Sequence, residues 1–413
     1  MTKRIIYVIL FISYSVSIYS GSDNCRGAGK SYFVNSSLLD DFFEKLLSLE
    51  NDKQGKVNIV HIGDSHIQAD FFTHAIRQRM QQKFGNAGYG FTFPYSLAKT
   101  NANNIVKYGS NVNWSSAKVL GSPADLSIGL GGINLRTSSD GFNIKLSVSG
   151  AYSFNTVKIV HPAWDSVFTL NGLDIPPIAE GVPSQNSEEE EAVLPTTMKQ
   201  GDFTIVQDKY VTSFSATDLL REVNITANEN KAVYTLNGIV LEKDDAGVLY
   251  HNIGVNGAKL SDYNKQELFF EQLSVLSPDL VIVSFGTNES FGKLSASSYM
   301  KQVDTFVANV MRENPYTTIL FTTPAPSLLK RKILNHLIQD YTDKLTGQTS
   351  FPVWDMLRAT GGIKAPLSGR YGGYMAKDKV HYKREGYVMQ ANLFVDDLLC
   401  LYEKYKYEKN LNN

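Results

Sequence analysis

The chain has only two cysteines, Cys25 and Cys400, among its 413 residues. This count excludes a disulfide-stapled scaffold and leaves no zinc-type cysteine spacing. The two thiols stand near opposite ends of the chain, and chain termini often lie close together in folded domains. The sequence alone therefore leaves open whether Cys25 and Cys400 pair or remain free.

The chain also lacks an excess of charge of either sign, because its formal net charge is −1. A neutral balance excludes general electrostatic attraction to nucleic acid or to an anionic membrane, so no nucleic-acid partner is expected. Apolar residues make up 43% and charged residues 20%, as in soluble globular proteins. The length suits two domains or one domain with a large insertion.

The apolar run at the N-terminus, Ile5 to Ile18, is shorter than the about 20 residues of a membrane-spanning helix. Two basic residues precede this run, and the small residues Ser20 and Gly21 follow it. This layout predicts a secretory signal peptide over residues 1–20, with an uncleaved anchor as the alternative. We therefore expect an exported protein, periplasmic or associated with the cell envelope, without stable membrane insertion after cleavage.

Strand-like and helix-like segments alternate in the first and last parts of the chain. Early on, the apolar strand 57–62 precedes a helix over 71–84. Later, helices are predicted over 262–276, 298–312, 328–345 and 384–405, with strands over 280–285, 318–322 and 351–354. Such alternation indicates a central parallel sheet with helices on both faces. We assign this α/β domain to residues 21–100 and 246–413.

The stretch between these parts has a different texture, rich in Ser, Asn, Gly and Thr. Residues 142–148 alternate between apolar and polar, as expected of a half-buried strand. The pairs Asn171–Gly172 and Asn237–Gly238 predict hairpin turns between strand-like runs. We therefore expect an inserted all-β sandwich over residues 101–245, which interrupts the α/β domain.

The tetrapeptide Gly63-Asp64-Ser65-His66 stands where the first strand of the parallel sheet ends. Reactive groups of open α/β sheets gather at the carboxyl ends of strands, where a serine hydroxyl and its backbone N–H face one pocket. The Gly-x-Ser-x-Gly elbow of α/β-hydrolases is absent, because position 67 is Ile. An ordinary surface turn is the structural alternative for this tetrapeptide.

Asp378 and His381 lie three residues apart, just before the final predicted helix. A serine hydroxyl needs a neighbouring base, and the reference pKa of histidine, about 6.5, lies near working pH. The aspartate can hold the imidazole in one tautomer and stabilise the imidazolium. Taken alone, the pair also fits a helix N-terminus with Asp378 as its cap.

Two further blocks carry residue types suited to stabilising an oxyanion. Asn288 lies in a Gly-Thr-Asn-Glu segment directly after the strand 280–285, and an amide donates without losing its proton. Gly254 and Gly257 lie in a Gly-Val-Asn-Gly-Ala segment, where a glycine brings its backbone N–H close to a substrate. Gly257 is preferred, with Gly254 as the competing candidate and a plain glycine-rich turn as the structural alternative.

The order Ser, Gly, Asn, Asp-x-x-His resembles the SGNH (GDSL-like) hydrolase superfamily. Residues 63–73, the later Gly88-Tyr-Gly90 and the phrase at 377–382 look like the bacterial peptidoglycan O-acetylesterases. This resemblance implies an SGNH-type three-layer α/β sandwich interrupted by a β-sandwich similar to carbohydrate-binding modules. It also implies roles: Ser65 as nucleophile, His381 as base, Asp378 as its partner, and an oxyanion hole of Ser65, Gly257 and Asn288.

The reaction implied by this resemblance is hydrolysis of O-acetyl esters on the C6 hydroxyl of N-acetylmuramic acid, through an acetyl-enzyme and without a metal or organic cofactor. The expected partner is O-acetylated peptidoglycan or another acetylated glycan. A metal cluster of His61, Asp64 and His66 is not expected, because His61 should point to the other strand face. Alternatives are an SGNH esterase, lipase or acetyltransferase with another substrate, and a non-catalytic glycan-binding protein.

Overall fold

The structure is a computed structural model that describes residues 31–101, 105–121, 123, 126–171 and 196–412. The predicted signal peptide, residues 1–20, and Cys25 lie outside the described residues. Cys400, on the last helix, is disulfide-bonded. Within the described ranges, no helix has the length and apolar character needed to cross a membrane.

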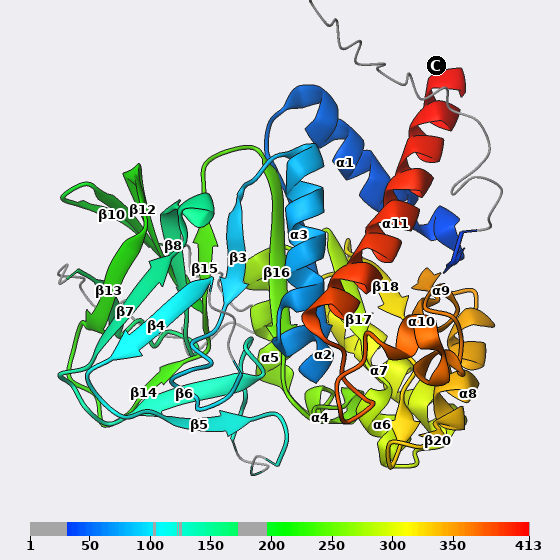
Figure 1. The fold of residues 1–413 in the computed structure, drawn as a ribbon. Coiled ribbons are helices and arrows are strands. Elements are labelled where there is room, and N and C mark those ends of the chain that lie inside the picture. The colour runs from blue at the N-terminus through cyan, green and yellow to red at the C-terminus, as the bar shows by residue number, and fades with distance from the viewer. Residues whose placement is uncertain (1–30, 102–104, 122, 124–125, 172–195, 413) are drawn as a thin grey trace, which may run out of the picture.

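A six-stranded sheet forms the centre of the α/β part (Figure 1). In spatial order it contains β1 (Phe33–Val34), β21 (Val353–Trp354), β18 (Thr318–Thr322), β17 (Leu280–Ser284), β2 (Lys56–Gly63) and β16 (Gly247–Gly254). All neighbours pair in parallel except β1 with β21. These strands are mostly buried apolar runs, as a parallel sheet covered on both faces requires.

Helices cover both faces of this sheet. On one face lie α1 (Asp40–Asp52), α3 (Phe71–Phe84) and α11 (Arg384–Asn412), whose residues Phe43, Met80 and Phe394 share a core with Ile59 and Ile282. On the other face lie α5 (Glu267–Leu273), α7 (Ala296–Glu313) and α8 (His336–Thr346), which pack in a second core with the sheet. This arrangement confirms the predicted three-layer α/β sandwich.

Most of the remaining strands form antiparallel sheets beside the α/β part (Figure 1). One contains β10 (Thr196–Gln200), β11 (Phe203–Gln207), β12 (Val211–Leu220), β8 (Phe154–Val160), β15 (Gly238–Glu242) and β3 (Gly88–Thr92). A second contains β4 (Val106–Ser110), β7 (Asn143–Val148), β13 (Glu222–Ala227) and β9 (Phe168–Leu170), and a third β14 (Tyr234–Leu236), β6 (Ile133–Thr137) and β5 (Ser115–Lys118). The domain boundaries at residues 101 and 245 stay a prediction.

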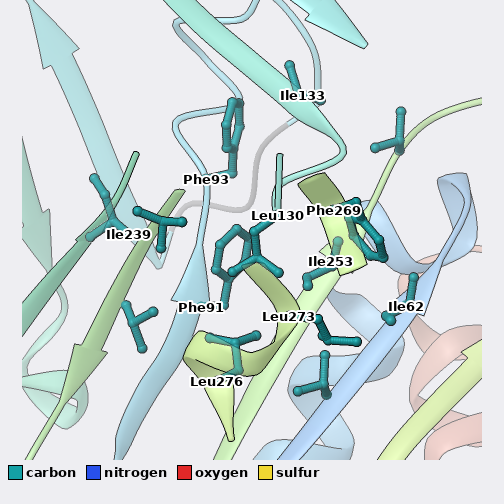
Figure 2. Packing of buried hydrophobic residues seen from close by; sticks show 14 of the residues in the cluster. Ile62, Phe91, Phe93, Leu130, Ile133, Ile239, Ile253, Phe269, Leu273 and Leu276 are labelled. Carbon is teal, nitrogen blue, oxygen red and sulfur yellow. The ribbon is translucent and has the colours of Figure 1, made fainter. Parts of the chain in front are cut away.

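The antiparallel sheets and the α/β part share one hydrophobic core. Figure 2 shows Phe91 and Ile239, from the antiparallel strands, in the same cluster as Ile62, Ile253 and Phe269 from the parallel sheet and its helix. All five side chains are at most 1% exposed. The β-rich stretch is therefore packed onto the parallel sheet that carries Ser65. Burial of the shared apolar surface stabilises both parts together.

Three predictions of local structure are wrong. Asn237–Gly238 is no hairpin turn, because β14 pairs with β6 whereas β15 pairs with β8 and β3. The predicted helix 328–345 begins only at His336, after a small hairpin of β19 (Leu328–Leu329) and β20 (Ile333–Leu334). The predicted helix 262–276 is divided into α4 (Leu260–Tyr263), α5 and a 3₁₀ turn, Ser274–Leu276.

Candidate active site

Ser65 lies at the carboxyl end of β2, as the first residue of the short helix α2 (Ser65–Gln68). Asp64 caps this helix, and its Oδ1 accepts a hydrogen bond from the His66 N–H at 2.9 Å. A Cβ on Gly63 would stand 2.3 Å from Ile67 Cγ1 and 2.8 Å from the Ser284 carbonyl oxygen. Only glycine therefore lets the chain turn this tightly from strand to helix in front of Ser65.

Asp378 and His381 lie in the loop between α10 (Gly369–Gly372) and α11. The structure brings them to Ser65, which is 316 residues away from His381 in the sequence. His381 Nδ1 lies 2.7 Å from Asp378 Oδ2, and His381 Nε2 lies 2.8 Å from Ser65 Oγ. Since Asp378 accepts the Nδ1 proton, Nε2 is the nitrogen that accepts from the Ser65 hydroxyl. This geometry can activate a nucleophilic serine.

Hydrogen bonds also keep Asp378 ionised. Its Oδ1 accepts from the N–H groups of Val380 at 2.9 Å and of His381 at 3.0 Å. Partial burial opposes ionisation, but the His381 side chain and these two N–H groups outweigh it and lower the pKa of Asp378 to about 2. Asp378 is therefore a carboxylate over the whole neutral range, as a partner for an imidazolium must be.

The loop that carries Asp378 and His381 is held against its surroundings. Leu328 of the β19–β20 hairpin donates its N–H to the Lys379 carbonyl oxygen at 2.8 Å. The Tyr382 hydroxyl donates to the Pro326 carbonyl oxygen, also at 2.8 Å, and is buried. The Ala376 N–H closes the loop on the His381 carbonyl oxygen at 2.8 Å. These contacts fix His381 relative to the sheet.

Gly254 and Gly257 have different environments. Gly254 ends β16, and a Cβ there would stand 2.2 Å from the Gln68 backbone nitrogen, so glycine is needed for α2 to approach. Gly257 adopts a φ of 81°, and among the described residues the one atom within 4 Å of a Cβ there is Leu120 Cδ2 at 3.4 Å. Leu120 belongs to the β-rich stretch and is 44% exposed. Steric need thus explains Gly254, whereas Gly257 has backbone geometry and space that suit an oxyanion donor.

Asn288 lies on the short helix α6 (Thr287–Phe291), directly after the carboxyl end of β17. Its Nδ2 donates to Asp64 Oδ2 at 3.2 Å and to the Ala258 carbonyl oxygen at 3.0 Å. Burial raises the pKa of Asp64 to about 7; the His66 N–H opposes this rise and the charge of Glu289 adds to it. The predicted oxyanion donor is thus linked both to the residue before Ser65 and to the loop that carries Gly257.

His66 lies beside the predicted base. Its Nδ1 is 2.9 Å from the Tyr387 hydroxyl, and its ring centroid is 5.1 Å from that of His381. Burial, and secondarily the charge of His381, lower the pKa of His66 to about 3. His66 therefore stays neutral and adds no repulsion when His381 takes up a proton. His61 lies deeper, hydrogen-bonded to Tyr250 and Ser284.

Sequence reasoning missed two buried polar residues of this site, Gln68 and Glu289. Gln68 is 1% exposed and its Oε1 accepts the Asn256 N–H at 2.7 Å. Glu289 accepts the Leu260 N–H at 2.9 Å and the Gly286 N–H at 3.0 Å. Local signals existed for both: Gln68 follows Ser65 by one helical turn, and Glu289 has the spacing of a capping box from Gly286.

The GDSL-like lipase/acylhydrolase family matches residues 201–394. The chain contains a GDSL-like lipase/acylhydrolase domain. The matched residues include Gly257, Asn288, Asp378 and His381, whereas Ser65 precedes them. The domain assigns the protein to the carboxylic ester hydrolases. No curated protein matches the chain.

A solved structure of a peptidoglycan O-acetylesterase is similar to this chain over almost its whole length, with a TM-score of 0.71 and 24% identity. The match covers 91% of this chain and 99% of that chain, so the fold extends through the antiparallel sheets. A lipase/acylhydrolase from Enterococcus faecalis is 18% identical, with 37% of this chain and 76% of that one covered and a TM-score of 0.30. A family 3 carbohydrate esterase from Talaromyces cellulolyticus is also 18% identical, with 39% and 73% covered and a TM-score of 0.29.

Proposed function

We propose that this GDSL-domain hydrolase removes O-acetyl groups from the C6 hydroxyl of N-acetylmuramic acid in peptidoglycan. The observation that carries the proposal is the Ser65–His381–Asp378 geometry in a chain that resembles a peptidoglycan O-acetylesterase over 91% of its length. We further propose that the protein is exported and acts in the periplasm or cell envelope, where this substrate lies.

In the proposed reaction, Ser65 Oγ attacks the acetyl carbonyl carbon while its proton passes to His381 Nε2. The ester carbonyl oxygen becomes an oxyanion, which accepts hydrogen bonds from the N–H groups of Ser65 and Gly257 and from Asn288 Nδ2. The tetrahedral intermediate then expels the sugar O6, which takes the proton from the His381 imidazolium. An acetyl group remains on Ser65, and His381 is again a neutral imidazole.

Deacetylation reverses these roles. A water molecule gives its proton to His381 Nε2 and attacks the acetyl carbonyl carbon. The second tetrahedral intermediate collapses with release of acetate, and Ser65 Oγ recovers the proton from His381. Asp378 stabilises the imidazolium in both halves of the reaction.

Exposed basic side chains on the β19–β20 hairpin and around the loop that carries Asp378 and His381 support an anionic substrate. We call this group the basic rim: Lys330, Arg331, Lys332, Lys377 and Arg384. The first three form the turn of the β19–β20 hairpin, which is bonded to the catalytic loop through Lys379. Within the described ranges none of the five forms an ion pair, although the whole chain is close to neutral. Peptidoglycan stem peptides carry carboxylates that such unpaired cations can attract.

The test compares acetate release from O-acetylated peptidoglycan, from O-acetylated xylan and from the neutral ester 4-nitrophenyl acetate. We expect the highest kcat/KM on peptidoglycan, with a KM that rises with salt because the rim cations are screened. Replacing Lys330, Arg331 and Lys332 by Gln should raise this KM and leave hydrolysis of the neutral ester unchanged. Preferential cleavage of xylan, or release only when an acceptor glycan is present, would overturn the proposed hydrolysis of peptidoglycan.

A further inference from the structure

The loop of residues 255–260, which we call the glycine loop, has six backbone N–H groups, and all but one of them donate a hydrogen bond to another described residue. Five of its six N–H groups have partners: Val255 donates to the Gly63 carbonyl (3.2 Å), Asn256 to Gln68 Oε1 (2.7 Å), Ala258 to the Val255 carbonyl (3.1 Å), Lys259 to Asp262 Oδ2 (3.0 Å) and Leu260 to Glu289 Oε1 (2.9 Å). The N–H of Gly257 has no partner among the described residues. Backbone donors are normally satisfied, so the loop leaves a single N–H available to a ligand.

Gln68 makes the shortest of these five contacts, and it does so from the helix that begins with Ser65. Its side chain is 1% exposed, and Oε1 accepts the N–H of Asn256, the residue directly before Gly257. The other end of the amide is also engaged: Nε2 donates to Thr100 Oγ1 at 3.0 Å and to the Asn101 carbonyl oxygen at 3.1 Å. Asn256 Nδ2 reaches the same Thr100 hydroxyl at 3.2 Å. One buried amide thus joins the nucleophile helix, the glycine loop and the chain segment before β4.

We infer that Gln68 is a positioning residue for the oxyanion hole, which fixes the Gly257 N–H relative to Ser65. The inference rests on the proposed roles of Ser65 and Gly257. Gly257 adopts a left-handed φ of 81°, and glycine has wide conformational freedom there, so a neighbour must hold its peptide in one orientation. The hydrogen bond to Asn256 does this on one side, and the Ala258 N–H bond to Val255 does it on the other.

This role predicts a specific kinetic defect. Without Gln68 Oε1, the Asn256 N–H loses its partner and the peptide that carries the Gly257 N–H can turn away from the oxyanion. Since an oxyanion donor matters in the transition state and little in the ground state, kcat should fall while KM changes little.

The experiment measures kcat and KM on 4-nitrophenyl acetate for Gln68→Leu, Gln68→Glu and the matched control Gln81→Leu. Gln81 is another buried glutamine, 7% exposed, whose Nε2 donates to the Gly88 and Val248 carbonyl oxygens away from the 255–260 loop. We expect Gln68→Leu to lose about tenfold or more in kcat, part of the 10²–10³ of a complete oxyanion donor. Gln68→Glu, which keeps an oxygen for the Asn256 N–H, should recover part of this loss.

The control separates positioning from folding. Gln81→Leu should lower Tm with kcat within about twofold of the parent, because it removes a buried donor from the Gly88 and Val248 carbonyl oxygens but does not touch the loop. Equal losses of kcat in Gln68→Leu and Gln81→Leu at equal Tm, or a parent-like kcat in Gln68→Leu, would overturn the inference. Ser65→Ala in the same assay makes the two failures distinguishable: if it stays active, the proposed function fails whatever Gln68 does.

Discussion

Asn288 donates a hydrogen bond to the carboxylate of Asp64, so the predicted third oxyanion donor is joined to the residue directly before Ser65. The second contact of the same Nδ2, to the Ala258 carbonyl oxygen, joins it to the residue after Gly257. In the proposed mechanism Asn288 therefore has two roles: it holds the glycine loop through Ala258, and its Nδ2 donates to the oxyanion.

Replacing Asn288 by Ala tests this double role. We expect kcat on 4-nitrophenyl acetate to fall by about 10²–10³, the usual loss for one oxyanion donor, with a small change in KM. Steady-state kinetics at neutral pH gives both constants. Asn309→Ala, on α7 away from the site, serves as the control for asparagine removal. A decrease in kcat of less than about fivefold would show that Asn288 contributes only to structure.

The raised pKa of Asp64 predicts a pH dependence of stability. Asp64 titrates at about 7 in the folded protein but near 3.8 when solvated, so the folded state binds more protons between these values. The contribution of Asp64 to stability must therefore fall as pH rises from about 4 to about 7 and then level off, and each pKa unit corresponds to about 1.4 kcal/mol. Asp64→Asn removes this contribution.

Denaturant unfolding of both proteins at pH 4.5, 6 and 7.5 measures the effect. We expect the difference in unfolding free energy, Asp64→Asn minus parent, to become more positive with rising pH. Asp140→Asn, which changes an exposed carboxyl group, is the matched control. A difference that stays constant for Asp64→Asn, or that becomes more negative, would contradict the burial effect on this carboxyl group.

Much of the α/β part could be predicted from local pattern. The helix 71–84 and the strand 318–322 have the predicted bounds, because periodic apolar residues and glycine or polar boundaries are local signals. The hairpin 328–334 could not be predicted, since Lys330 and Arg331 adopt positive φ without glycine and its place depends on the contact of Leu328 with Lys379. Strand partners in the β-rich stretch are likewise set by distant residues, as the Asn237–Gly238 junction shows.

In the candidate site, too, sequence motifs predict some features, whereas others depend on contacts between distant residues. The order of four motifs was enough to predict that Ser65, Asp378 and His381 meet, and the structure brings them together. The contact between Gln68 and Asn256 joins residues 188 positions apart, and neither residue type indicates it. Sequence patterns thus identify residues that react, whereas the buried polar contacts that hold them in place depend on tertiary packing.

Glu289 offers a test of how the glycine loop is attached to the N-terminus of α6, the helix that carries Asn288. Its two carboxylate oxygens accept the N–H groups of Leu260 and Gly286, and burial raises the pKa of this 1% exposed side chain. Gln has only one acceptor oxygen, so Glu289→Gln leaves one buried N–H without a partner. We expect a loss of about 1–3 kcal/mol in unfolding free energy, together with a lower kcat.

Denaturant unfolding and ester hydrolysis are measured on the same preparation. The matched control is Glu267→Gln, which changes an exposed glutamate on α5 and should leave both quantities near those of the parent. If Glu289→Gln keeps the stability and the kcat of the parent, the bridge between Leu260 and Gly286 has no energetic importance.

The most direct test of the proposed mechanism is to look for the acetyl group on Ser65. The protein is mixed with O-acetylated peptidoglycan, quenched in acid during turnover, digested and analysed by peptide mass spectrometry, while released acetate is measured in parallel. We predict one acetyl group on the peptide that contains Ser65, and no acetylation or acetate release in Ser65→Ala. Acetate release that persists in Ser65→Ala, or an acetyl group found on another residue, would contradict the assignment of Ser65 as the nucleophile.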